Sequence, residues 1–234
     1  MVHPQFKNDE SEALKIYEKI GYHIEYNFIS DEMVDSIIKE AHKIHGQKDE
    51  EFRPLMMPHR QSPLFADFIK NDELVKIISL LIGGQGVGIQ SEFFFSKPTT
   101  SGFAAHQDNF YVEANPNYFV SAWTALTDVG EHNGGLYFYP GSHKCGKLPV
   151  KKLEKIVREG QDPNANDQET IVPEGSQKIF PEIPKGAIVF LHSEVVHGSC
   201  VNKSNFFRYA LLNTYIKKGE YFRPGNHAKR AEIS

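Results

Sequence analysis

Residues 86–95 read GVGIQSEFFF, and four runs of the same kind follow: YFVSAWTAL at 118–126, GLYFY at 135–139, AIVFL at 187–191 and FRYALLNTYI at 207–216. β-Branched and aromatic residues dominate each run, and Gly, Pro, Asn and Ser separate the runs, which is typical of β-strands joined by turns. The pattern lacks the regular alternation of strand and helix that builds a parallel sheet. We therefore expect a mainly β protein with flanking helices, whose core is an antiparallel sandwich or barrel.

The part of the chain before this core predicts helices. A first short helix contains Tyr17, and apolar residues recur with helical spacing over 33–41, where Ser30 is the expected N-cap. A third helix fits residues 72–82, with Asn71 as its cap. We expect these helices to pack on one side of the β core.

The whole chain, residues 1–234, is expected to form a single domain, because it is long enough to bury one large core. This domain would consist of a mainly helical flank at 1–85 and the β core at 86–216. The stretch 144–185 is polar, breaks the strand rhythm and contains one possible helix at 150–158. We expect it to be an insertion at the mouth of the core that acts as a lid.

Composition narrows the range of partners. The chain has 26 Lys and Arg against 30 Asp and Glu, a net charge of −4, so nothing favours nucleic acid or a membrane surface. Its two cysteines, Cys145 and Cys200, lack a CxxC spacing, and no apolar run is long enough to span a bilayer. We expect a cytoplasmic protein that acts on a small molecule; the sequence does not encode a readable oligomeric state.

The triplet His106-Gln107-Asp108 is the first candidate for chemistry. On an extended segment, residues i and i+2 project to the same face, so an imidazole and a carboxylate can reach one metal ion together. Such a triplet alone is weak evidence, because it also arises by chance.

Support comes from FLHSEVVHGSCVNKSNFFRYALL at 190–212, which places His197 after one β run and Arg208 at the start of another. Two His and one Asp form a facial triad, which suits Fe(II) with three open positions for O2 and a chelating 2-oxo acid. The far carboxylate of that acid needs a cation, and Arg208 would lie on an inward face with Ala210, Leu212 and Thr214. A salt bridge at the rim is the alternative role for Arg208.

Four motifs then resemble the phytanoyl-CoA dioxygenase family of Fe(II)/2-oxoglutarate-dependent oxygenases. They are FFFSKP at 93–98, HQDNFY at 106–111, SAWTALTDVGEHNGGLYFYPGSHK at 121–144 and GAIVFLHSEVVHGSCVNKSNFFRYAL at 186–211. The resemblance implies a double-stranded β-helix, the jelly-roll or cupin-like fold. It also implies a dioxygenase that uses Fe(II), 2-oxoglutarate and O2 to hydroxylate a substrate, with release of succinate and CO2.

The resemblance also implies roles for individual residues. His106, Asp108 and His197 correspond to the metal ligands and catalytic centre, and Arg208 corresponds to the anchor for 2-oxoglutarate. Four residues are expected at the cosubstrate: Arg208, the hydroxyl of Ser199, and the side chains of Trp123 and Gln107.

Two further motifs are interpreted with the resemblance. His192 is the rival of His197, but only His197 has the family's spacing to Arg208, so we expect His192 to be structural or to support the ligands. The turn Pro140-Gly141-Ser142-His143 is expected to be structural. Related halogenases carry a small residue in place of the carboxylate, so Asp108 indicates hydroxylation.

Two other classes of protein remain possible at this point. One is a cupin-like metal enzyme of another class, such as a zinc or manganese isomerase, and the other is a non-catalytic binding module on the same fold. The substrate is not encoded in a readable way, although we expect a small polar metabolite and not an acyl-CoA. Candidate pocket residues are Gln90, Asn109, Tyr111, Tyr118, Arg60 and Arg223.

Overall fold

The computed structural model describes residues 2–46, 52–153 and 167–233. Its helices are α1 (Glu10–Ile20), α2 (Asp31–His45), α3 (Pro63–Ile69), α4 (Asp72–Leu81) and α5 (Asn109–Val112), with 3-10 turns η1 (Pro58–Arg60), η2 (Pro116–Tyr118) and η3 (Ser142–Cys145). Among the described residues, none of these helices is long and apolar enough to cross a membrane.

One large antiparallel sheet organises the molecule. Its strands run in the order β1-β8-β4-β10-β3-β2. They are β1 (Tyr22–Glu25), β2 (Leu55–Met56), β3 (Gly86–Ser96), β4 (Phe119–Ala125), β8 (Ile188–His192) and β10 (Arg208–Lys217). The five predicted runs all contain strands, four of them in this sheet. The sequence did not predict β1 and β2, which the segment expected to be mainly helical adds to the sheet.

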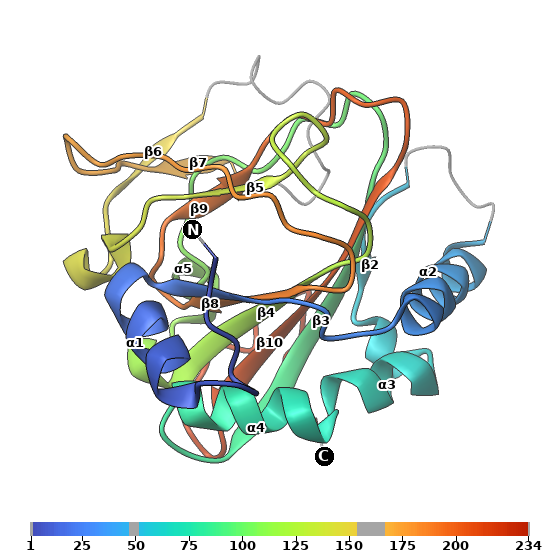
Figure 1. Ribbon diagram of the computed structural model, residues 1–234, viewed down its shortest axis with the longest axis horizontal. Helices are drawn as coiled ribbons and strands as arrows, with labels where there is room; N and C mark the ends of the chain where they lie inside the picture. The colour runs from blue at the N-terminus through green and yellow to red at the C-terminus, as the bar shows by residue number, and fades with distance from the viewer. Residues whose placement is uncertain (1, 47–51, 154–166, 234) are drawn as a thin grey trace.

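The two faces of this sheet bury different sets of side chains, because successive residues of a strand point to opposite sides. One face, with Phe93, Val120, Phe190 and Leu211, packs against the apolar stripes of the helices. Figure 1 shows α3 and α4 lying along this face. Each large apolar side chain buried here contributes about 1.5–3 kcal/mol, so the helices and the sheet stabilise each other. The prediction that the N-terminal helices pack on one side is confirmed.

The helix starts follow the predicted caps. The Ser30 hydroxyl accepts a hydrogen bond from the Met33 amide, and the Asn71 side chain accepts one from the Leu74 amide. Both helices therefore begin where the sequence places them. Helix α3 was not predicted, because its seven residues carry too short an apolar pattern to be recognised.

A second, smaller sheet covers the opposite face. It consists of β5 (Leu136–Phe138) and β9 (His197–Ser199), paired antiparallel. Leu136 and Phe138 pack with Phe94, Trp123 and other buried residues of the large sheet. The two sheets thus form a sandwich, and the candidate site lies between them.

The described part of the 144–185 insertion contains a two-stranded hairpin of β6 (Val150–Lys152) and β7 (Gln168–Thr170). The helix expected at 150–158 is wrong for residues 150–152, because these pair as a strand with β7. Leu153 is not helical either, and residues 154–158 of that expected helix lie outside the described residues. The Thr170 amide donates to the carbonyl of Ala105, so the insertion is attached to the segment that carries His106.

Candidate metal centre and its cavity

His106 and His197 form an isolated antiparallel β-bridge with each other. Asp108 lies at the N-terminal end of α5 in helical backbone conformation. The expectation that the 106–108 segment is extended throughout is therefore incorrect: the chain turns into α5 at Asp108. That turn, combined with the bridge, brings the three side chains together.

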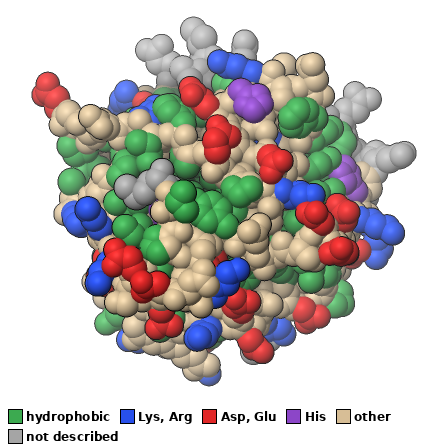
Figure 2. Space-filling model, viewed as in Figure 1, with side chains coloured by type: hydrophobic (Ala, Val, Ile, Leu, Met, Phe, Trp, Pro, Cys, Tyr) green, Lys and Arg blue, Asp and Glu red, His purple; other side chains and the backbone are tan. Residues whose placement is uncertain are grey.

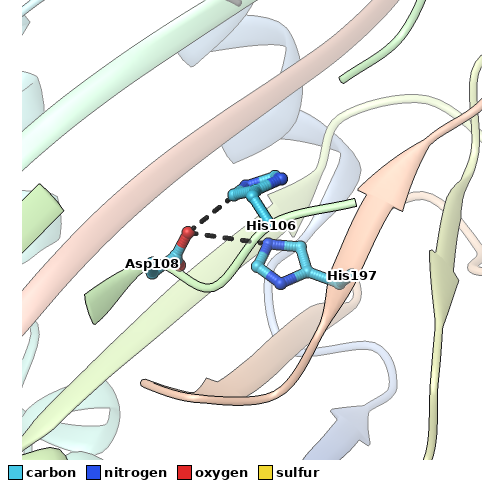
Figure 3. A group of neighbouring side chains, drawn as sticks. All are labelled: His106, Asp108 and His197. Carbon is cyan, nitrogen blue, oxygen red and sulfur yellow. Dashed lines mark ion pairs between the residues drawn. The ribbon is translucent and has the colours of Figure 1, made fainter. Parts of the chain in front are cut away.

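The three side chains converge on one point, as Figure 3 shows. The Nε2 atoms of His106 and His197 lie 3.5 and 3.6 Å from Oδ1 of Asp108. One ligand atom from each residue lies within 4.8 Å of the others. Two ligands of one ion at bond lengths of about 2 Å can be at most about 4 Å apart, so both His–Asp pairs satisfy this limit.

Neighbouring groups orient all three side chains. His106 Nδ1 lies 2.8 Å from the carbonyl oxygen of Ala104, and His197 Nδ1 lies 3.1 Å from that of Val195. A carbonyl can only accept, so in the neutral form of each ring Nδ1 carries the proton and Nε2 presents a lone pair. The Ser121 hydroxyl donates to Oδ2 of Asp108 at 2.6 Å and leaves Oδ1 facing the imidazoles.

The electrostatics of the cluster favour a bound cation. Burial would raise the pKa of Asp108, but the neighbouring histidines and the Ser121 hydroxyl outweigh it and lower that pKa. Burial, together with the charge of His106, lowers the pKa of His197 to about 4. Burial also acts to lower the pKa of His106, but the hydrogen bond and charge of Asp108 raise it above its usual value. An ionised carboxylate beside a neutral imidazole suits a divalent ion.

This donor set fits Fe(II). It provides two nitrogen ligands and one oxygen ligand from the same side, and the three side chains line a cavity of about 390 Å³. Such a set leaves positions open for other ligands, as in non-haem iron oxygenases.

Arg208 lines the same cavity at the start of β10 and is only 3% exposed. Its guanidinium carbon lies 5.7 Å from the centre of the Trp123 ring, which also lines the cavity. Leu212 and Thr214, on the same face of β10, line it as well. The inward direction expected for Arg208 is thus the one observed.

Ser199 also lines the cavity, next to the metal-binding segment. Its Oγ accepts a hydrogen bond from the Phe103 amide at 2.8 Å. The hydroxyl acts as the acceptor in this bond, so it can still donate its own proton to a ligand carboxylate.

Gln107 does not lie where the resemblance implied. Its amide nitrogen donates to the carbonyls of Gly146 and Glu194, and its oxygen accepts from the Leu148 amide. These three bonds turn the side chain away from the cavity, which Gln107 does not line. We therefore correct the cofactor-binding expectation: Gln107 joins the metal-binding segment to the start of the insertion.

His192 is set apart from the metal ligands. Its Nδ1 accepts from the Glu194 amide at 3.1 Å, and its ring lies 4.9 Å from that of His143. The 140–143 turn has the supporting contacts expected of it: the Ser142 hydroxyl accepts from the Val196 amide at 2.8 Å, next to His197.

The candidate pocket residues fall into two groups. Gln90 and Tyr111 line the cavity, whereas Asn109, Tyr118, Arg60 and Arg223 do not. Sequence reasoning missed three polar lining residues: Glu92, His227 and Arg230. Glu92 could have been found, because it shares a strand face with Gln90. His227 and Arg230 follow the last strand and belong to no pattern that points to a pocket.

The sequence model of phytanoyl-CoA dioxygenase (PhyH) matches residues 17–210. A phytanoyl-CoA dioxygenase from Arabidopsis thaliana is 30% identical over 177 residues, which cover 75% of this chain and 60% of that protein. Phytanoyl-CoA dioxygenase 1 from Oryza sativa is 28% identical over 211 residues, covering 89% of this chain and 69% of that protein. The chain thus spans about 60–70% of the length of these relatives.

Solved structures share the fold at low identity. The carbocyclase SnoK from nogalamycin biosynthesis, described as non-haem and α-ketoglutarate-dependent, has a TM-score of 0.75 at 20% identity, covering 97% of this chain and 91% of that chain. EctD from S. alaskensis, solved with 2-oxoglutarate and 5-hydroxyectoine, has a TM-score of 0.67 at 19% identity, covering 88% and 76%. These likenesses confirm the expected jelly-roll fold, here built as two antiparallel sheets.

Proposed function

The chain belongs to the phytanoyl-CoA dioxygenase family, and from that premise we propose that it is an Fe(II)- and 2-oxoglutarate-dependent hydroxylase of a small molecule. One molecule each of substrate, 2-oxoglutarate and O2 would give the hydroxylated product, succinate and CO2. The observation that carries the proposal is the convergence of two Nε2 lone pairs and one carboxylate oxygen beside a cavity that contains a buried arginine.

In this proposal His106, Asp108 and His197 hold the iron. When bound, iron and 2-oxoglutarate supply the oxidative chemistry that activates O2. The protein holds the three ligand side chains in position. The carbonyls of Ala104 and Val195 fix the histidine rings, and the Ser121 hydroxyl fixes the carboxylate.

Arg208 would bind the far carboxylate of 2-oxoglutarate, since a guanidinium offers two parallel donors in a plane. Ser199 would donate its free proton to the same group. The rings of Phe94 and Trp123, 7% and 4% exposed, line the cavity with them and would exclude water from this contact.

A small polar substrate fits better than an acyl-CoA. A CoA tail would need several cations for its phosphates, and the basic run of the sequence consists of Lys147, Lys151, Lys152, Lys155 and Arg158. Lys151 pairs with Glu169 at 3.0 Å, Lys147 lies over the ring of Phe110, and Lys152 is exposed on the β6 strand. Lys155 and Arg158 lie outside the described residues. Acidic and basic side chains lie interspersed over the face shown in Figure 2.

The experiment is succinate release from 2-oxoglutarate by the purified chain, with Fe(II), with Zn(II) and without metal. Succinate formed only with Fe(II), and coupled to a hydroxylated product, is the expected result. Succinate release with Fe(II) but without a hydroxylated product would instead favour an iron-dependent oxidation that does not hydroxylate its substrate. No release under any condition would favour a binding module or another metal enzyme.

A further inference from the structure

The end of the cavity away from Arg208 contains two side chains of opposite charge, Glu92 and Arg230. Leu212 of β10 pairs with Glu92 of β3, and Thr214 pairs with Gln90. At the usual rise per residue, these two pairs lie roughly 13 and 20 Å along β10 from Arg208. Glu92 and Gln90 both line the cavity, as does Arg230 from the segment after β10. This polar end is therefore distinct from the proposed 2-oxoglutarate anchor.

Arg230 is aimed at this end by its own contacts. Its Nε donates to Oε1 of Gln90, and its Nη1 donates to the carbonyls of Tyr111 and Arg223 at 3.3 and 3.2 Å. No described residue accepts a hydrogen bond from its remaining nitrogen, Nη2. The guanidinium is thus held on one side and keeps a donor for a ligand.

The segment that carries Arg230 is itself tied to the body of the protein. Arg60 donates to the carbonyls of Ala228 and Lys229, at 3.2 and 2.6 Å. The Ile233 amide donates to the carbonyl of Gly88 on β3 at 2.8 Å. Arg60, expected from the sequence as a pocket residue, therefore acts as a positioning residue for Arg230.

Glu92 places a carboxylate beside this arginine. It is 8% exposed, and Gln90 lies between the two charges, donating to Oε2 of Glu92 at 3.4 Å while accepting from Arg230. Burial and the charge of Arg223 lower the pKa of Arg230, while Glu92 and Asp108 act in the opposite direction. An arginine remains charged under such influences.

We propose that the substrate is a small zwitterion, an amino-acid-like molecule whose carboxylate binds Arg230 and whose ammonium group binds Glu92. This inference rests on the proposed oxygenase function and adds the class of its substrate. A substrate with only an acid group would face Glu92, and one with only an amine would face Arg230. A neutral apolar substrate would displace water from the Arg230 guanidinium and offer it no hydrogen bond in return.

The size of the cavity agrees with this class. Its volume of about 390 Å³ has to hold 2-oxoglutarate as well as the substrate. The remaining space suits a compact molecule, which reaches both charges within a short span.

The test uses the free L-amino acids, each with two matched analogues. One analogue is the primary amide, which lacks the carboxylate, and the other is the acid in which hydrogen replaces the amino group. Binding is measured by calorimetry and by the shift in Tm, with Mn(II) in place of Fe(II) and with 2-oxoglutarate present. We expect at least one amino acid to bind, and both of its analogues to bind roughly 10- to 100-fold more weakly, since each loses a hydrogen-bonded charge.

Three variants assign the two contacts. Arg230→Gln should abolish the preference for the amino acid over its amide, and Glu92→Gln should abolish the preference over the deaminated acid. Lys229→Gln removes an exposed neighbouring cation and should keep both preferences. The Tm of each variant without ligand shows whether it folds. The proposal is overturned if no amino acid binds, if the analogues bind equally well, or if both variants keep both preferences.

Succinate release without any amino acid separates this inference from the proposed function. Iron-dependent release together with failed amino-acid binding would leave the oxygenase function standing and remove the zwitterion. Absence of succinate release together with selective amino-acid binding would support the zwitterion site and contradict the oxygenase function.

Discussion

His106 and His197 exchange two backbone hydrogen bonds, the His106 amide to the His197 carbonyl at 2.8 Å and the His197 amide to the His106 carbonyl at 3.0 Å. Residues far apart in the chain are thereby held as directly opposed partners of an antiparallel pair. Their imidazole centres lie 4.3 Å apart. The backbone therefore sets the spacing of two proposed metal ligands before any ion binds, which reduces the cost of assembling the site.

Replacing His197 with alanine should abolish iron binding and turnover while leaving the fold intact, because His197 contributes one of three converging ligand atoms. His192→Ala is the matched control, since that ring packs on His143 and does not line the cavity. Fe(II) titration by calorimetry under anaerobic conditions, with circular dichroism for the fold, measures both. Metal binding that survives in His197→Ala and disappears in His192→Ala would reverse the assignment.

Ser121→Ala should lower metal affinity by about 10- to 100-fold, because it removes the 2.6 Å hydrogen bond that orients Asp108. Thr124→Val on the same strand is the control. Its hydroxyl is buried and has no hydrogen-bond partner in the part of the chain that the structure describes, so its loss should leave affinity unchanged. Mn(II) titration of both variants checks this. Equal affinities would show that Asp108 is oriented without Ser121.

Arg208→Lys should raise the KM for 2-oxoglutarate more than it lowers kcat, because lysine keeps the charge but loses the planar pair of donors. Loss of one charged hydrogen bond corresponds to a rise of roughly 10- to 100-fold in KM. Steady-state succinate formation over a range of 2-oxoglutarate concentrations measures the two constants. An unchanged KM would remove Arg208 from the cosubstrate site.

The free energy of unfolding should fall as the pH is lowered through the range in which His192 is protonated in the unfolded chain but neutral in the folded protein. Burial, together with the charge of His143, lowers the pKa of His192 from 6.5 to about 4 in the folded protein. Above pH 6.5 both states are neutral at this residue. Between pH 6.5 and 4 the unfolded chain binds a proton that the folded chain does not, so unfolding becomes easier as the pH falls.

The contribution of His192 to this loss is on the order of 3 kcal/mol at most. His192→Asn keeps an acceptor for the Glu194 amide but does not titrate, so its free energy of unfolding should depend less on pH than that of the wild type. Urea unfolding of both proteins at pH 8 and pH 5 tests this. The difference between the two proteins isolates His192 from the other histidines. Identical pH dependence would contradict the assignment.

The parts of the site that the sequence predicted are those with local patterns. His106, Asp108 and Arg208 were found because a spacing or a strand face defines them, and those side chains do line the cavity. Gln107 was misplaced because the neighbours of an amide decide its direction, and these neighbours, Gly146 and Glu194, come from distant loops.

In the fold as well, elements with a local sequence pattern were predictable and elements defined by tertiary pairing were not. Long apolar runs and capped helices were predictable, whereas β1 was not. Its four residues, YHIE, are all buried, including His23 and Glu25, so they show no alternation of polar and apolar positions. Tertiary pairing with β8 defines this strand, and a single sequence does not show that pairing.

The family match ends at residue 210, and Arg230 lies beyond it. If Arg230 selects the substrate as proposed, the metal ligands and this substrate-binding residue come from separate stretches of the chain. Contacts such as those of Arg60 with Ala228 and Lys229 hold the two stretches together. Substitutions after β10 would then change which substrate binds and leave the metal ligands unchanged. Substrate specificity could therefore evolve, or be engineered, by exchanging the segment after β10 between relatives.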